Sequence, residues 1–431
     1  MTAEVAIFNK SAIALAADSA VSIEGFESSK IYNNAEKLFA LTKHHPVAIM
    51  IFERNELQGV PWEIIIKAFR KELGSKSYPT VKEYQTAFLD FSKRFYLNIP
   101  TSTRDEWLDI SIQDIIEQTG DLVQERVESS FDKQMREIDI VDHEVDNLLA
   151  LYESTPYFDG LCDNDIDEQS IDGYDLACEV LSECILVTEL SNIEKKDWSI
   201  TCDKFYSLCK QRLLKQDPLF EGITGLVFAG YGETEYFPVL IECAVYGVIG
   251  DKLKVNDISS AGVTDIVTSG IRAFAQKEEV STFMEGISQS QRQNISANFS
   301  SLLTERNESI VEIIHELAPE DKKEEMVERY MKKLNGALEH STEELLEYTR
   351  INHVEKVLRM VEHLPKNELA YMAESMVNLT AFKRKVSNES DSVGGPIDVA
   401  VISKGDGFVW IKRKHYFPSE LNTHYGPKTE V

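Results

Sequence analysis

Short apolar runs typical of β-strands lie at the beginning, in the middle and near the end of this 431-residue chain. The first two, residues 3–8 and 12–17, are separated by a short polar break, which favours an antiparallel hairpin. The other runs are residues 37–41, 46–52, 225–232, 237–250, 397–402 and 408–413. Because an isolated strand pair is marginally stable, these distant segments must share sheets. The sequence therefore predicts a core that is discontinuous along the chain.

The segments between these runs are predicted to be mostly helical. Pro61 and Gly74 suit the two ends of a helix, since proline is favoured in the first turn and glycine just beyond the last. The apolar residues that share one face of this helix are Trp62, Ile65, Phe69 and Leu73. Residues 80–215 continue as helices, around an acidic loop expected at residues 163–175.

A second long helical region is predicted over residues 264–387, with breaks near Pro319 and Pro365. Its last helix is expected to pack through one apolar stripe. That stripe consists of Leu369, Met372, Met376, Leu379 and Phe382.

These patterns divide the chain into four parts. Residues 1–79, 216–265 and 366–414 form the discontinuous core. Residues 80–215 form an acidic helical insertion, residues 266–365 form a second helical insertion, and residues 415–431 form a flexible tail. We find no internal repeat.

The formal net charge of −28 is unevenly distributed, and no lysine or arginine occurs from Glu137 to Glu194. Such a surface repels phosphate backbones, so we expect no nucleic-acid partner. An acidic face can attract a basic protein, although it more often keeps a protein in solution.

The sequence does not indicate a membrane-spanning segment, a metal site or disulfide bonds. No run of 18 to 20 apolar residues occurs, and the N-terminus lacks the pattern of a signal peptide, so we expect no membrane partner and a cytoplasmic location. The six cysteines form no CxxC pair and are expected to be reduced thiols. The histidines show no metal-ligand spacing, so we expect no metal and no cofactor.

The hairpin places two polar residues in register at its open end. If it turns around Lys10, the numbers of opposed residues sum to about 20, which sets Val5 opposite Leu15 and Thr2 opposite Asp18. Met1 precedes a small residue, so an aminopeptidase is expected to remove it. Thr2 then carries a free α-amine with a pKa of about 7.7 to 8.0. Such an amine can accept the hydroxyl proton and make the threonine oxygen a nucleophile.

These residues resemble the active-site pattern of proteasome β-type subunits, which are N-terminal-nucleophile hydrolases. The matching positions are Thr2, Asp18 within ALAADSA, and Lys37 within NAEKLFAL. The interval from Asp18 to Lys37 is longer than in the family, which we assign to a longer loop through residues 24–30. Lys30 is a weaker candidate for the lysine.

Two downstream stretches extend this resemblance. LVFAGYG followed by a strand is similar to a hairpin of the family's second sheet. VNLTAFKRKV followed by SVGGPIDVAVI is similar to the last helix, glycine turn and strand of bacterial proteasome-like subunits. Residues 80–215 and roughly 275–365 have no counterpart that we identify.

The resemblance implies an α+β fold of the four-layer αββα type with large helical insertions. It also implies that Thr2 attacks the amide bond of a peptide or protein, while Asp18 and Lys37 maintain the charge balance. Supporting roles would fall to Ser260, Asp391 and Ser392. Assembly into a homo-oligomeric ring, and an unfoldase or basic protein as partner, would follow from the same resemblance.

One departure from the family concerns the group that stabilises the oxyanion. The family has a glycine after the fourth strand, where a backbone N–H fulfils this role, whereas this chain has Phe52 and Glu53. Loss of one such donor can cost about 2.7 to 4 kcal/mol of transition-state stabilisation. Two alternatives therefore stay open: an amidase or acylase of the same fold that acts on small molecules, and a catalytically silent scaffold that binds partners through its acidic insertion.

Overall fold

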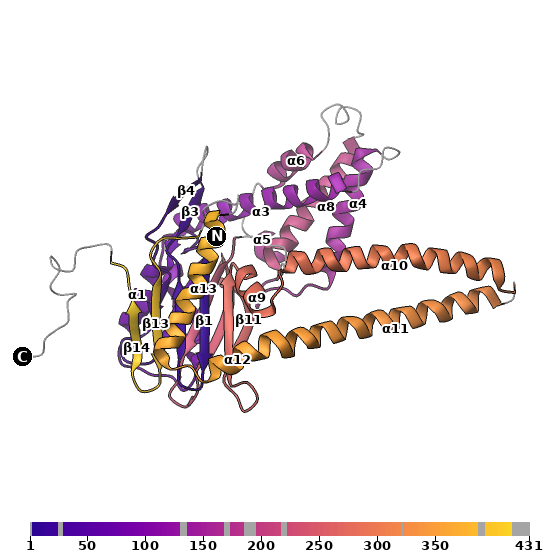
Figure 1. The fold of residues 1–431 in the computed structure, drawn as a ribbon. Coiled ribbons are helices and arrows are strands. Elements are labelled where there is room, and N and C mark those ends of the chain that lie inside the picture. Colours follow the sequence, from indigo (N-terminus) through magenta and orange to yellow (C-terminus); the bar gives the residue numbers. More distant parts are fainter. Residues whose placement is uncertain are drawn as a thin grey trace, which may run out of the picture. The chain divides into compact units, whose positions relative to one another are not determined.

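The computed structural model describes residues 2–24, 29–129, 136–167, 173–184, 195–216, 222–319, 322–386 and 393–415. The chain divides into two compact units. Figure 1 labels the helices and strands. The first comprises Met1–Leu38, Tyr236–Val239 and Gly262–Val431, and the second comprises Phe39–Glu235 and Leu240–Ala261. The predicted tail after residue 415 and the candidates Asp391 and Ser392 lie outside the described residues.

The first unit contains a five-stranded sheet with the order β12-β1-β2-β13-β14. Its strands are β1 (Ala3–Asn9), β2 (Ile13–Ala17), β12 (Ser269–Ala275), β13 (Asp398–Ser403) and β14 (Gly407–Lys412). Every neighbouring pair in this sheet is antiparallel. The predicted pairing of the N-terminal and C-terminal runs in one sheet is confirmed, with β13 hydrogen-bonded directly to β2.

Strand β12 was not predicted, and it corrects the proposed insertion at 266–365. Residues 269–275 pair with β1 along its full length, from Ala3 opposite Ala275 to Asn9 opposite Ser269. The segment contains a glycine, an arginine and a serine, so its apolar content alone does not mark it as a strand. Its conformation is set by pairing with a distant strand rather than by local sequence.

The register of the first hairpin differs by one residue from the prediction. Val5 lies opposite Ala16, and Ala6 lies opposite Leu15. The reason is the turn, which is closed by a hydrogen bond from the N–H of Asn9 to the carbonyl of Ala12 and leaves only two residues in the loop. As a result Asp18 pairs through its backbone with Ala3, not with Thr2.

Helix α13 (Lys366–Val386) packs on β1, β2 and β13. Small and apolar residues on one side of the sheet face it, among them Ala3, Val5 and Ile7. The predicted stripe on α13 is only partly correct, because Leu379 and Phe382 are exposed. The residues that are buried are Leu369, Ala370, Ala373, Met376, Val377 and Thr380. Small side chains allow the helix to approach the sheet closely, which a search for large apolar residues does not detect.

The other helices of the first unit form the second insertion. They are α9 (Glu278–Glu285), α10 (Gln289–Leu317), α11 (Lys323–Thr349), the π-helical turn η2 (Arg350–Val354) and α12 (Glu355–Glu362). The long helices α10 and α11 run side by side (Figure 1). The predicted breaks at Pro319 and Pro365 are confirmed, since each proline lies between two helices.

The second unit contains a sheet with the order β11-β10-β9-β6-β5. Its strands are β5 (Leu38–Ala40), β6 (Val47–Glu53), β9 (Thr224–Gly230), β10 (Val239–Ile249) and β11 (Lys252–Gly262). Strand β11 was not predicted, whereas the other four match predicted runs. Two short hairpins lie outside these sheets: β3 (Val21–Glu24) with β4 (Ser29–Tyr32) in the first unit, and β7 (Glu56–Leu57) with β8 (Val60–Pro61) in the second.

The helices of the second unit follow the predicted pattern. Pro61 and Gly74 bound α1 (Trp62–Leu73), and its four predicted apolar residues are buried. The remaining helices are α2 (Val81–Leu97), α3 (Thr101–Ser129), α4 (Glu137–Glu153), α5 (Asn164–Asp167), α6 (Gly173–Glu183) and α8 (Lys195–Leu214). The acidic stretch predicted as a loop instead forms α5 and the start of α6 where it is described. Among the described residues, no helix is both long enough and apolar enough to cross a membrane.

Candidate active site

Thr2 lies immediately before β1 and is 3% exposed. Its hydroxyl donates a hydrogen bond to Oε2 of Glu4, at 3.0 Å. Residues two apart along a strand point to the same face, so the strand conformation brings these two side chains together. The threonine oxygen is thereby held in a buried polar cluster at the start of the first sheet.

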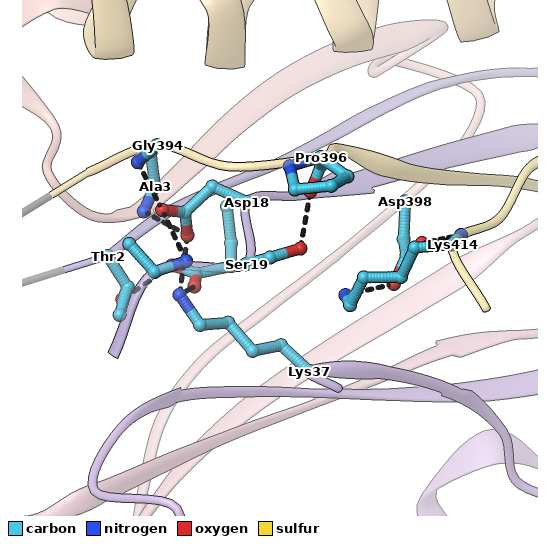
Figure 2. A network of polar contacts seen from close by, with 11 residues as sticks. Thr2, Ala3, Asp18, Ser19, Lys37, Gly394, Pro396, Asp398 and Lys414 are labelled. Carbon is cyan, nitrogen blue, oxygen red and sulfur yellow. Dashed lines mark hydrogen bonds and ion pairs between the residues drawn. The ribbon is translucent and has the colours of Figure 1, made fainter. Parts of the chain in front are cut away.

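Asp18 follows β2 and is 1% exposed. Its Oδ1 accepts hydrogen bonds from the N–H of Ala3 at 3.2 Å and from Nζ of Lys37 at 2.5 Å. Its Oδ2 accepts from the N–H groups of Ala20 at 3.3 Å and Gly394 at 2.9 Å (Figure 2). Four donors around one carboxylate satisfy its oxygens and fix its orientation.

Lys37 lies just before β5 and is 5% exposed. Its Nζ is 2.5 Å from Oδ1 of Asp18 and 3.5 Å from Oε1 of Glu4. A buried ammonium group is costly without a carboxylate partner, and here two carboxyl groups approach it. The predicted lysine therefore does meet the predicted aspartate. The other candidate, Lys30, lies in β4, and its side chain is outside the described residues.

Glu4 is the residue of this cluster that the sequence analysis missed. It is fully buried, and burial is the largest of the effects that raise its pKa from 4.5 to about 8. The charge of Lys37 lowers this pKa, and the charge of Asp18 raises it. The available signal was one ionisable residue within the otherwise apolar run AEVAIF, two positions after the threonine. An acid at such a position either has a buried partner or a chemical role.

The Thr2 hydroxyl reaches the Asp18–Lys37 pair through Glu4. Oε2 of Glu4 accepts the hydrogen bond from Thr2. Oε1 of Glu4 lies near Nζ of Lys37 but forms no hydrogen bond. The three residues predicted from the sequence thus belong to one buried cluster. The fourth member, Glu4, connects the nucleophile candidate to the other two.

The supporting candidates are placed differently from what was predicted. Ser260 was expected before a helix but lies in β11 of the second unit, because that segment pairs with β10. Phe52 and Glu53 end β6, also in the second unit.

Glu53 has an unusual backbone conformation for a residue other than glycine. Its φ is 65°, in the left-handed region where few residues other than glycine are stable. On the same strand, the ring of Phe52 covers Gly225 of β9, since an added Cβ at Gly225 would lie 2.0 Å from that ring. Glu53 therefore carries a side chain at a position whose backbone geometry favours glycine.

Replacing Gly395 with alanine is expected to lower the free energy of unfolding by about 1 to 3 kcal/mol. Gly395 has a φ of 78°, and an added Cβ would lie 2.8 Å from Cβ of Asn33. The matched control is Gly394→Ala, since nothing lies within 4 Å of a Cβ added there and the N–H that binds Asp18 is retained. Urea unfolding of both variants measures the effect, and equal stability of the two would contradict it.

Comparison with protein-family models finds no match, and comparison with curated proteins also finds none. Among solved structures, the chain is similar to the Anbu (Gly-1) mutant from Hyphomicrobium sp. strain MC1. That alignment covers 96% of this chain and 86% of the other chain, at 11% sequence identity and a TM-score of 0.29. Chains with so low a TM-score do not superpose as one arrangement, so this similarity assigns neither a family nor a function.

Proposed function

We propose that this protein is an N-terminal threonine hydrolase that cleaves amide bonds. The supporting observation is the buried cluster in which Asp18 holds Lys37 at 2.5 Å and Glu4 contacts both Lys37 and the Thr2 hydroxyl. A hydroxyl is a weak nucleophile until a neighbouring group accepts its proton. A buried cluster of oriented charges next to that hydroxyl is the arrangement that such activation requires.

In this proposal, removal of Met1 leaves Thr2 as the first residue, and its Oγ1 attacks the substrate carbonyl carbon. The leaving amine takes up a proton as the C–N bond breaks, and water then hydrolyses the ester formed on Thr2. Lys37 favours the deprotonated oxygen, and Asp18 neutralises the charge of Lys37. The free α-amine of Thr2 is one acceptor for the hydroxyl proton.

The finer features of the proposal follow from the sequence resemblance. They are a four-layer αββα arrangement of sheets and helices, peptide or protein substrates, and assembly into a homo-oligomeric ring. Cleavage of a peptide at several positions would support this substrate class over a small-molecule amide.

The proposal predicts that a β-lactone, which acylates an N-terminal threonine, adds once to the purified protein. Intact mass spectrometry should show loss of the initiator methionine and gain of one lactone. Thr2→Ala should abolish the addition, because it removes the oxygen that would be acylated. Thr2→Ser, which keeps both a hydroxyl and a small second residue, is the matched control and should still react.

A processed wild-type protein that never reacts with the lactone would contradict the proposal. A second candidate would then gain support, namely a catalytically silent scaffold. The 3% exposure of Thr2 favours that candidate, since a substrate must reach the threonine oxygen. Undiminished cellular function of Thr2→Ala would separate the scaffold from the hydrolase.

A further inference from the structure

Glu4 is a carboxyl group that the activity described above does not require. It lies near the start of the otherwise apolar strand β1, it is fully buried, and its Oε1 has no hydrogen-bond partner. Burying an acid with an unsatisfied oxygen costs free energy that an apolar residue at this position would avoid. A residue that is costly to the fold and in contact with the candidate nucleophile calls for a chemical role.

The geometry around the Thr2 hydroxyl is that of a proton donor and its acceptor. The Oγ1-to-Oε2 distance of 3.0 Å is within the range over which a general base removes a proton directly. Both side chains extend from the same short stretch of backbone at the beginning of β1. The contact therefore depends on the extended conformation of that strand alone.

Asp18 and Glu4 have different hydrogen-bond partners, which indicates different roles for the two acids. Asp18 binds Lys37 and three backbone N–H groups, so its oxygens are fully occupied. Glu4 has only the Thr2 hydroxyl and the more distant ammonium of Lys37, at 3.5 Å. Two neighbouring carboxyl groups in such different surroundings suit different tasks: Asp18 is engaged by four donors, whereas Oε2 of Glu4 contacts the Thr2 hydroxyl.

Among the described residues, the strands beside β1 place no ionisable residue directly opposite Glu4. Its cross-strand partners are Ala17 in β2 and Phe274 in β12, and neither can ionise. Lys37 and Asp18 are the charged groups that act on it. Helix α13 covers the face of β1 that carries Ala3 and Val5, which is the opposite face to that of Glu4.

We propose that Glu4 is the general base that accepts the Thr2 hydroxyl proton, an inference that rests on the proposed hydrolase function. The O–H bond of Thr2 breaks and its proton moves to Oε2 of Glu4, while the oxygen electron pair forms the bond to the carbonyl carbon. The carbonyl π electrons move onto the oxygen. When the intermediate collapses, the C–N bond breaks, and the leaving nitrogen takes the proton back from Glu4.

The raised pKa of Glu4 is suitable for a general base. A base is most effective when its pKa is close to the working pH, and burial raises the pKa of Glu4 to about 8. The α-amine of Thr2 titrates in a similar range, at about 7.7 to 8.0. A pH profile of the wild type alone therefore does not separate the two bases, whereas a substitution at Glu4 does.

The test is the rate of Thr2 acylation by the β-lactone between pH 5.5 and pH 9.5, measured by intact mass on the full chain. Glu4→Gln keeps the shape of the side chain but cannot take up the proton. We expect it to react at least about 100-fold more slowly than the wild type and to lose the rise in rate around pH 8. Glu4→Asp, which still carries a carboxyl group, should recover part of the rate.

Glu279→Gln is the matched control, because Glu279 is also a buried acid with one oxygen that lacks a hydrogen bond, but it lies in α9 outside the cluster. It should acylate at the wild-type rate. A Glu4→Gln protein that keeps the wild-type pH profile and a rate within about threefold would overturn the role of Glu4 and leave the α-amine as the base. If the wild type itself fails to react, the hydrolase function and this role both fall. If Glu4→Gln does not fold, the Glu4→Asp protein decides, since a rate as low as that of Thr2→Ala would also overturn the proposal.

Discussion

Replacing Asp18 with alanine is expected to lower the free energy of unfolding by about 3 to 5 kcal/mol. The substitution leaves the ammonium group of Lys37, which is 5% exposed, without its nearest carboxylate. It also leaves the N–H groups of Ala3, Ala20 and Gly394 without their acceptor. Each buried donor that loses its partner adds to the cost. Chemical denaturation at neutral pH measures the difference from the wild type.

The matched control is another buried ion pair of the first unit. Asp398 binds Nζ of Lys414 at 2.6 Å, and both side chains are largely buried (Figure 2). Asp398→Ala should also destabilise the protein, but it should leave acylation of Thr2 unchanged, because this pair does not contact the cluster around Thr2. Asp18→Ala should lose both stability and acylation. A destabilisation of Asp18→Ala below about 1 kcal/mol would show that the four contacts do not hold the site together.

The stability of the wild type is expected to fall relative to that of Glu4→Gln as the pH rises from 5 to 8. The folded state keeps the proton on Glu4 up to a pKa of about 8, whereas the unfolded state releases it near 4.5. Between these values the folded state binds more protons, so its stability decreases with increasing pH. The glutamine variant lacks this proton and therefore lacks the decrease.

The expected size of this effect is on the order of 3 kcal/mol between pH 5 and pH 8, from a free-energy cost of about 1.4 kcal/mol for each pH unit. Urea unfolding of the two proteins at a series of pH values measures it directly. Because the readout is stability, the result does not depend on any catalytic activity. Parallel curves for the two proteins would contradict the raised pKa of Glu4.

The main elements of the site could be predicted because they depend on local patterns. A short polar break separates the two N-terminal apolar runs, so their antiparallel pairing could be predicted. This pairing also brings Asp18 close to the start of β1. The register was wrong by one residue because the loop contains only Lys10 and Ser11, a detail of turn geometry. The predicted pairing of Thr2 with Asp18 was therefore wrong by one position, since the side chain and the backbone of Asp18 both bind Ala3.

Features that depend on distant contacts could not be predicted in this way. Strands β11 and β12 carry polar residues, and their conformation comes from pairing with β10 and β1. Glu4 was missed because a strand with one acid among apolar residues usually exposes that acid at an edge. Here β1 has a neighbour on each side, so the acid is enclosed. Central position in a sheet is a property of the whole topology, not of the seven residues of the strand.

The bond from Gly394 to Asp18 joins residues 376 positions apart, and β13 pairs directly with β2. During synthesis, the first residues leave the ribosome long before their partners exist. The newly made chain therefore presents Asp18 without the N–H of Gly394, and β2 without its neighbour β13, until the residues around β13 have emerged. Contacts of such high sequence separation also form slowly once the chain is complete. The protein is thus expected to complete the contacts of Asp18 late in its biogenesis.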